Sequence, residues 1–314
     1  MIDNNAISPM LKVNSQESKV VHIPVLSREV IELLTLKAND SAIDCTLGGG
    51  GHAKMILEKT RPEGKILGID IDSTKLGDLQ KEFDKDFPGR AKFVHGNFRD
   101  LEKIAHDFGF SKAKAILIDL GFSSFQIEDP DRGFSFQEEE SLLDMRLDRT
   151  RGDTAADLLN SAKEEEISKK IWEYGQERFA RAIAKQIIKR RKNYPYIKTK
   201  DLLLTVLPFY KKFEYSRRHP ATRVFQAMRI WVNDELGSLE VAIPQAIELL
   251  ETEGRLAIIS FHSLEDRIVK WRFRDFAKLG IVKIITKKPI VPSEEEINEN
   301  PRARSAKLRV IEKI

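Results

Sequence analysis

Residues 41–53 read SAIDCTLGGGGHA, and this stretch decides the fold class. A short apolar strand at Ser41–Cys45 is followed by four glycines and then by a helix predicted over His52–Lys59. Glycine lets the backbone pass close to a ligand, and the free N–H groups at the start of the next helix can bind one. The stretch fits the G-x-G-x-x-G/A pattern of dinucleotide-binding sheets. It predicts a cofactor site, with a flexible glycine turn as the alternative.

Strands and helices alternate through the first half of the chain. Further strands are predicted at Lys65–Asp70, Ala91–His95 and Ala113–Asp119. The last of these contains the unbroken apolar run Ala115–Ile118, which is typical of a central buried strand. This alternation predicts an α/β fold, a parallel sheet covered by helices.

The rhythm changes in the second half. From about Asp129 to Arg218 only helical patterns occur, and a strand returns at Gly254–Phe261. The predicted organisation is a flexible N-terminal tail (1–21), a first part of the sheet domain (22–130), an inserted helical domain (131–218) and a second part of the sheet domain (219–314).

Polar groups are expected where the strands end. Asp70 ends the second strand, about 20 residues past the glycines, where a carboxylate accepts hydrogen bonds from two ribose hydroxyls. This pairing suits nicotinamide adenine dinucleotide and S-adenosylmethionine equally well. Asp119 ends the fourth strand, and a carboxylate there suits a cationic sulfonium and an amine nucleophile better than a hydride acceptor. The structural alternative for Asp119 is a helix or turn cap. Phe98 is expected either to lie against an adenine ring or to pack in the core.

Two later segments are candidates for substrate contact. On the predicted helix Ala221–Asn233, Thr222, Gln226, Arg229 and Asn233 share one face, which lines a base pocket or faces solvent. His262 follows the fifth strand and touches an extruded base, or else Ser263 simply caps the next helix. No metal site is expected, because the other five histidines have no ligand-like spacing to His262.

Composition limits the class of protein. The 53 Lys and Arg against 49 Asp and Glu give a net charge of +4, which is compatible with an anionic partner. Basic residues crowd 185–200, 211–223 and 302–309, and Arg302 and Arg304 form a plausible phosphate clamp. The single Cys45 rules out a disulfide within one chain and favours a cytoplasmic location. The sequence lacks an apolar run of roughly 18 residues, which argues against a membrane span.

Nine blocks of sequence resemble the ribosomal RNA small subunit methyltransferase H family. They are 22–26, 44–52, 119–124, 132–136, 143–146, 219–223, 229–233, 260–267 and 300–305. The resemblance implies methyl transfer from S-adenosylmethionine to N4 of a cytidine in the decoding region of 16S ribosomal RNA. It also implies a Rossmann-like class I methyltransferase sheet with an inserted all-helical subdomain.

The resemblance also assigns residues. Its cofactor contacts fall on Gly50, Gly51, His52, Asp70, Phe98, Asp119 and Gln126. Together with the patterns above, the candidate catalytic residues are Asp119, Ser123 and His262, and the candidate substrate-binding residues are Arg223, Gln226, Arg229, Asn233, Arg302 and Arg304. The implied partner is 16S ribosomal RNA in the small subunit or its precursor, with monomer and homodimer both open.

The sequence departs from the family at one loop. Phe122 and Phe125 stand where the family usually has valine and proline, which puts the shape of the loop carrying Gln126 in doubt. The two prolines that follow the acidic or polar residue in many amino-methyltransferases are also absent after Asp119, so that mechanism does not transfer intact.

Three other functions stay open from the sequence. A nicotinamide-dependent oxidoreductase is supported by the glycine pattern and Asp70 alone. A non-catalytic RNA-binding factor that keeps a cofactor fold is the second. A small-molecule methyltransferase is the third, and the helical insertion and basic C-terminal segment disfavour it.

Overall fold

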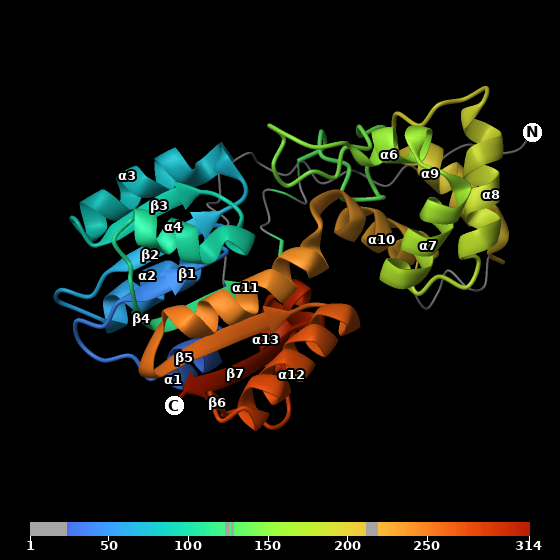
Figure 1. Ribbon diagram of the computed structural model, residues 1–314. Coiled ribbons are helices and arrows are strands. Elements are labelled where there is room, and N and C mark those ends of the chain that lie inside the picture. The colour runs from blue at the N-terminus through green and yellow to red at the C-terminus, as the bar shows by residue number, and fades with distance from the viewer. Residues whose placement is uncertain (1–23, 123–125, 127–128, 212–218) are drawn as a thin grey trace, which may run out of the picture.

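Parallel strands form most of the sheet in the computed structural model, which describes residues 24–122, 126, 129–211 and 219–314. Among these residues seven strands pair in the order β3-β2-β1-β4-β5-β7-β6 (Figure 1). Strands β1 to β5 are parallel, whereas β7 runs antiparallel to both β5 and β6. The strands are β1 (Ala42–Asp44), β2 (Ile66–Asp70), β3 (Ala91–His95), β4 (Ala113–Asp119), β5 (Leu250–Ser260), β6 (Val282–Ile284) and β7 (Lys307–Lys313).

Helices cover both faces of this sheet. Side chains alternate along a strand, and in β4 Ala115 and Leu117 enter one apolar core while Ile116 and Ile118 enter the other. The first core is closed by α1 (Ser27–Leu34), α2 (Gly51–Lys59) and α3 (Leu76–Asp86). The second is closed by α4 (Leu101–Asp107), α11 (Glu235–Leu249) and α12 (Ser263–Lys278). This arrangement confirms the predicted α/β class.

The inserted helices build a third core of their own (Figure 1). They are α6 (Ala155–Ser161), α7 (Glu164–Gly175), α8 (Ala180–Arg191) and α9 (Thr199–Val206). The following helix α10 (Thr222–Asn233) contributes Val224, Phe225 and Met228 to this same core. The boundary at 218/219 stays a prediction, and the packing of α10 favours a boundary after this helix instead.

Some local details of the helices differ from what the sequence predicts. Helix α13 (Glu294–Glu299) is not among the elements expected from the sequence. A 3-10 turn over Ser73–Lys75 leads into α3, and the Asp72 side chain accepts from the Thr74 N–H at its start. The cap of α12 is His262 rather than Ser263. None of the helices in the described ranges is long and apolar enough to span a membrane.

A buried arginine ties the start of the inserted segment to the sheet. The Arg132 guanidinium, 5% exposed, lies 2.7 Å from the Asp72 carboxylate and 3.3 Å from that of Asp129. Removing one partner of a buried ion pair leaves the other charge uncompensated. We therefore expect Arg132→Ala to lower the free energy of unfolding by about 3 kcal/mol in urea titrations.

The matched control is the exposed pair of Arg28 and Glu32, whose nitrogen and oxygen are 2.7 Å apart. Water screens this pair, so Arg28→Ala should leave the unfolding midpoint unchanged. Equal midpoints for the two variants would show that the Arg132 pair does not stabilise the fold.

Candidate active site

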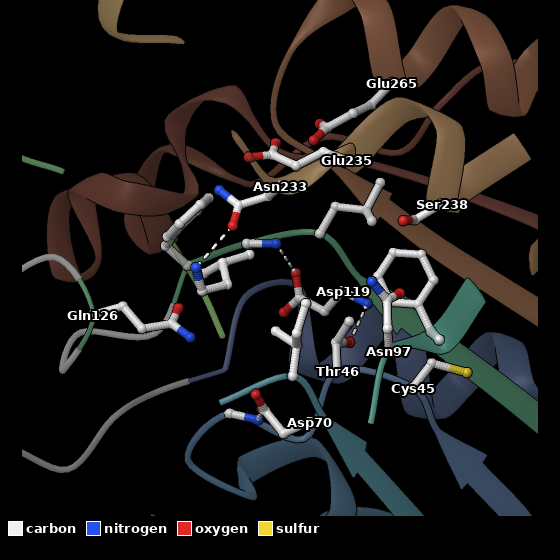
Figure 2. Close-up of a pocket in the computed structure, with 17 residues that line it drawn as sticks. Cys45, Thr46, Asp70, Asn97, Asp119, Gln126, Asn233, Glu235, Ser238 and Glu265 are labelled. Carbon is white, nitrogen blue, oxygen red and sulfur yellow. Dashed lines mark hydrogen bonds between the residues drawn. The ribbon is translucent and has the colours of Figure 1, made fainter. Parts of the chain in front are cut away.

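A pocket opens at the carboxyl ends of the parallel strands. The order of the strands reverses between β1 and β4, and ligands of such sheets bind at this switch point. Residues after β1, β2, β3 and β4 line it: Cys45, Thr46, Gly48, Asp70, Ile71, Asn97, Phe98, Asp119, Leu120, Gly121, Phe122 and Gln126. Figure 2 shows Asp119 between Asp70 on one side and Glu235 and Glu265 on the other.

The glycine loop is fixed by the Asp70 carboxylate. Gly48 and Gly50 have φ angles of 52° and 75°, in the left-handed region that glycine adopts without strain. The Gly48 N–H donates to Asp70 Oδ2 at 2.6 Å, and the Asp72 N–H donates to Oδ1 at 2.8 Å. Burial raises the pKa of Asp70 to about 6 in spite of these two bonds. Each carboxylate oxygen keeps a further lone pair for a ligand hydroxyl.

Asp119 is held in a defined orientation at the end of β4. Its Oδ1 accepts from the Gly121 N–H at 3.0 Å, and its own N–H donates to Thr46 Oγ1 at 2.6 Å. Position 121 has no room for a side chain, since a Cβ there would lie 2.8 Å from the Phe261 ring. The Asp119 side chain is 18% exposed, and Oδ2 lies 3.5 Å from His52 Nε2. One oxygen is thus fixed by the backbone, and the other lies beside a histidine.

Two buried polar side chains adjoin this carboxylate. Asp44 at the end of β1 is buried, and its Oδ2 has no hydrogen-bond partner in the described structure. His52 in the first turn of α2 is also buried, and neither ring nitrogen has such a partner there. Burial raises the pKa of Asp44 to about 6. Such groups are rare away from binding sites, because an unpaired buried polar group costs free energy.

Comparison with known proteins decides the family. The family model described as the MraW methylase family matches residues 19–314. The chain belongs to this family. Its membership decides between the two cofactors that the glycine pattern and Asp70 leave open, in favour of S-adenosylmethionine. It confirms the resemblance seen in the sequence.

Relatives of this methylase match over nearly their whole length. Proteins named ribosomal RNA small subunit methyltransferase H from Fusobacterium nucleatum and Persephonella marina are each 45% identical to it. The alignments cover 93% and 94% of this chain and 97% and 100% of the relatives. Among solved structures, a putative methyltransferase from Streptococcus mutans in complex with SAH is 12% identical, with a TM-score of 0.40 over 92% of this chain and 95% of the other.

Four of the seven cofactor residues predicted for this methylase line the pocket. They are Asp70, Phe98, Asp119 and Gln126. Gln126 is buried, with Nε2 3.5 Å from Asp72 Oδ2. Gly50, Gly51 and His52 are not among the lining residues; Gly50 is the N-cap of α2 and Gly51 begins this helix. Ser123 and Phe125 lie outside the described residues. The cofactor-binding roles of all seven residues stay predictions.

The polar stripe of α10 contacts the protein itself. Gln226 Nε2 donates to the Tyr174 carbonyl at 3.0 Å, and the Arg223 guanidinium donates to the Gln176 carbonyl at 3.3 Å. Asn233 accepts from the Leu147 N–H at 2.8 Å and donates to the Met145 carbonyl at 2.7 Å. Asn233 also lines the pocket. The other side chains of the stripe stay predicted substrate contacts.

Phe122, which stands where the family usually has valine, contacts side chains from other parts of the fold. Its ring packs edge-on against Phe134, with centroids 5.0 Å apart, and the Arg229 guanidinium lies 4.3 Å from its centroid. The same guanidinium makes two hydrogen bonds of 2.9 Å to the Glu235 carboxylate. Phe122, Arg229 and Glu235 thus link the loop after β4 to α10 and α11 at the pocket.

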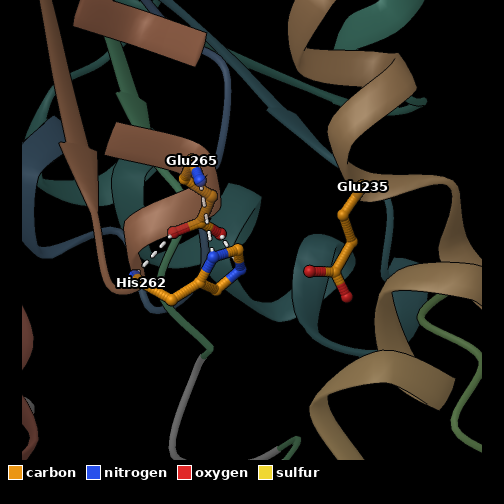
Figure 3. A group of neighbouring side chains, drawn as sticks. All are labelled: Glu235, His262 and Glu265. Atoms are coloured by element: carbon orange, nitrogen blue, oxygen red, sulfur yellow. Dashed lines mark hydrogen bonds and ion pairs between the residues drawn. The ribbon is translucent and has the colours of Figure 1, made fainter. Parts of the chain in front are cut away.

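His262 lies beside two glutamates (Figure 3). Each of the three side chains offers one atom of a kind that can bind a metal, and these atoms of Glu235, His262 and Glu265 lie within 4.8 Å of one another. The spacing of the histidines along the sequence does not predict this group, because its other two members are glutamates. Each group already has a partner in the protein. His262 Nδ1 accepts from the Glu265 N–H at 3.4 Å, Glu265 Oε2 accepts from the Phe261 N–H at 2.7 Å, and Glu235 binds Arg229. The expectation of no metal stays a prediction.

Pocket residues from the helices were missed by sequence reasoning. Glu235 and Ser238 belong to α11, and Glu265 belongs to α12. Leu147 also lines the pocket and lies in the segment before α6. Charge or polarity in a helix does not indicate which pocket it faces. Arg302 and Arg304 are exposed in the 3-10 turn Pro301–Ser305 that precedes β7.

Proposed function

We propose that this methylase transfers a methyl group from S-adenosylmethionine to N4 of a cytidine in the decoding region of 16S ribosomal RNA. The observation that carries the proposal is the placement of Asp119 in a pocket at the carboxyl edge of the sheet, where its carboxylate accepts from the Gly121 N–H and its own N–H donates to Thr46 Oγ1. The printed names of the relatives support a small-subunit ribosomal RNA substrate. The target nucleoside comes from the family resemblance.

The residues present fit the donor. Asp70 offers paired carboxylate oxygens to ribose hydroxyls, and the loop from Gly48 to Gly50 leaves the backbone open to close approach. Phe98 and Asn97 at the end of β3 line the same side of the pocket. The buried, unpartnered Oδ2 of Asp44 is an acceptor suited to an ammonium group. S-adenosylmethionine supplies an electrophilic methyl group on a sulfonium.

Asp119 prepares the nucleophile. The lone pair of an exocyclic amine is conjugated with the ring, so an acceptor that binds its N–H makes the nitrogen a better nucleophile. Asp119 Oδ2, which is not bound by a backbone N–H and lies 3.5 Å from His52 Nε2, is such an acceptor and can also take the proton lost after transfer. A protonated His52 imidazole at this position stabilises the Asp119 carboxylate. The fixed carboxylate therefore supplies both orientation and a proton acceptor.

The far end of the pocket suits an amino-bearing base. Asn233, Glu235, Ser238 and Glu265 bring mainly hydrogen-bond acceptors to it, and cytosine presents an N4 amino donor. A base in a duplex or stacked strand must be extruded to enter this pocket. A substrate in the small ribosomal subunit or its precursor, and a cytoplasmic site of action, belong to the same proposal.

Donor affinity should depend on pH through Asp70. Its pKa is about 6, and only the ionised carboxylate accepts from both hydroxyls. The dissociation constant for S-adenosylmethionine, measured by calorimetry, should therefore rise about tenfold between pH 7 and pH 5. The Asp70→Ala variant is the control and should lose most of this dependence. A pH-independent affinity in the wild type would contradict the role of Asp70.

The same carboxyls give the opposite trend in stability. Asp44 and Asp70 have folded pKa values of about 6 against 3.8 for an exposed aspartate, so the folded state holds its protons more tightly. The free energy of unfolding contributed by these two groups should thus fall as pH rises from about 4 to about 6. Urea titrations of the wild type and of Asp44→Asn across this range isolate the Asp44 part of the slope.

Methyl transfer to ribosomal particles tests the proposal. Tritiated S-adenosylmethionine is incubated with the protein and small-subunit particles from a strain that lacks its gene, with large-subunit particles as control. Label should enter only the small-subunit RNA, and nucleoside mass analysis should find N4-methylcytidine. A different methylated nucleoside would refute the assignment to N4. Absence of label from all RNA would instead favour the non-catalytic RNA-binding alternative.

A further inference from the structure

An exposed face of α12 carries an aromatic residue among cations. Arg267, Trp271, Arg274 and Lys278 are all exposed and follow one another at intervals of four, three and four residues. At 100° per residue these positions lie on one side of a helix, about 16 Å from end to end. We call these four residues the α12 stripe.

Trp271 makes the α12 stripe more than a solvated charged face. Its side chain is 49% exposed, which is uncommon for a large apolar ring. The Lys270 ammonium lies 5.6 Å from the ring and the Arg274 guanidinium 5.2 Å. Arg267 and Arg274 have no carboxylate within ion-pair distance among the described residues, and Lys278 has only Asp275 at 3.9 Å. The cations of the stripe are largely available to an external anion.

Helix α12 begins at the pocket, and the α12 stripe lies on the side of this helix that faces away from Glu265. β5 ends at Ser260, α12 begins at Ser263, and Glu265 in its first turn lines the pocket two residues before Arg267. Asp266, next to Arg267, lies 3.6 Å from Lys307 and 2.7 Å from Arg309 at the start of β7. In Figure 1 helix α12 lies below the inserted helices, and it packs in the same core as α11.

We propose that the α12 stripe binds the single-stranded RNA that flanks the extruded target base. Arginine and lysine neutralise phosphates, and an exposed tryptophan stacks on a base of any identity. A length of about 16 Å corresponds to about five nucleotides at the roughly 3.4 Å rise of a stacked strand. The inference rests on the proposed function for the identity of the RNA. The stripe contributes affinity and the direction of the strand, whereas the pocket selects the base.

The first test is the salt dependence of RNA binding. A short single-stranded RNA with a fluorescent end label is titrated with wild type and with the triple variant Arg267→Gln, Arg274→Gln and Lys278→Gln at several KCl concentrations. Loss of three phosphate contacts should reduce the slope of log affinity against log salt by about 2. Lys81→Gln, Lys85→Gln and Lys103→Gln form the matched control, because these exposed lysines lie on α3 and α4. The control should keep the wild-type slope.

Trp271 is tested separately from the charges. Trp271→Ala should weaken RNA binding about tenfold at low salt without changing the slope, and Trp271→Phe should recover most of the affinity. In methyl-transfer assays the triple variant should raise KM for small-subunit particles and leave kcat and donor affinity at wild-type values. Calorimetry with S-adenosylmethionine confirms that each variant keeps its fold.

Unchanged salt slope and unchanged KM in the triple variant would overturn the proposal. A change in mass by light scattering in Trp271→Ala, with RNA binding intact, would overturn it in favour of contact between two copies of the chain. Failure of the proposed function can be distinguished from failure of this proposal. The proposed function fails if the wild type transfers no label to particles, whereas RNA binding by the α12 stripe is measured without catalysis.

Discussion

Asp119→Asn should lower kcat for methyl transfer by about a thousandfold while the protein stays folded. The amide keeps the size of the side chain and an oxygen to accept from the Gly121 N–H, but it cannot take a proton. General-base and orienting contributions of this kind are typically 10²- to 10⁴-fold. The measurement is the initial rate of tritium transfer at saturating S-adenosylmethionine and saturating small-subunit particles.

A matched control separates chemistry from surface charge. Asp107→Asn removes an exposed carboxylate at the end of α4 and should transfer methyl groups at the wild-type rate. The dissociation constant of Asp119→Asn for the donor should change far less than kcat. A kcat within threefold of the wild-type value would remove Asp119 from the chemistry and require another proton acceptor.

Asp70→Ala should weaken S-adenosylmethionine binding about a hundredfold and leave kcat at saturating donor nearly unchanged. Two charge-assisted hydrogen bonds to the ribose are lost, each strong because the carboxylate is buried. The Gly48 N–H also loses its acceptor, which loosens the glycine loop. Calorimetry gives the dissociation constant, and steady-state rates give KM for the donor and kcat.

The contrast between these two variants is itself a test. Asp119→Asn lowers kcat with little change in donor binding, whereas Asp70→Ala raises the donor KM with little change in kcat. Donor affinity within twofold of wild type in Asp70→Ala would place the donor elsewhere. Equal losses of kcat in both variants would mean that the two carboxylates do not divide binding from chemistry.

The cofactor half of the site was predictable because it depends on local rules. Parallel strands bring their carboxyl ends to one edge, so Asp70 and Asp119 had to lie at the same edge once the strands were recognised. Gly48 and Gly50 have the left-handed φ angles that a glycine loop suggests. The antiparallel direction of β7 was not predictable, since periodicity within a strand carries no information about its partner.

The substrate half depends on long-range packing. Asn233 was correctly placed on the polar side of α10, and it lines the pocket while bonding to the backbone at 145 and 147. Gln226 shares that polar side, yet it bonds to the Tyr174 carbonyl at the end of α7. Glu235 and Glu265 reach the pocket from separate helices, and no spacing between them signals this. Helical periodicity identifies a face of a helix, but it does not identify what the face contacts.

The most direct test of the central claim is a crystal structure of the protein with S-adenosylmethionine. We expect donor density in the pocket at the carboxyl ends of β1, β2 and β4, with the ribose hydroxyls at Asp70 and the methyl group directed toward Asp119. Density for the donor at any other place, with this pocket filled only by solvent at saturating ligand, would contradict the account.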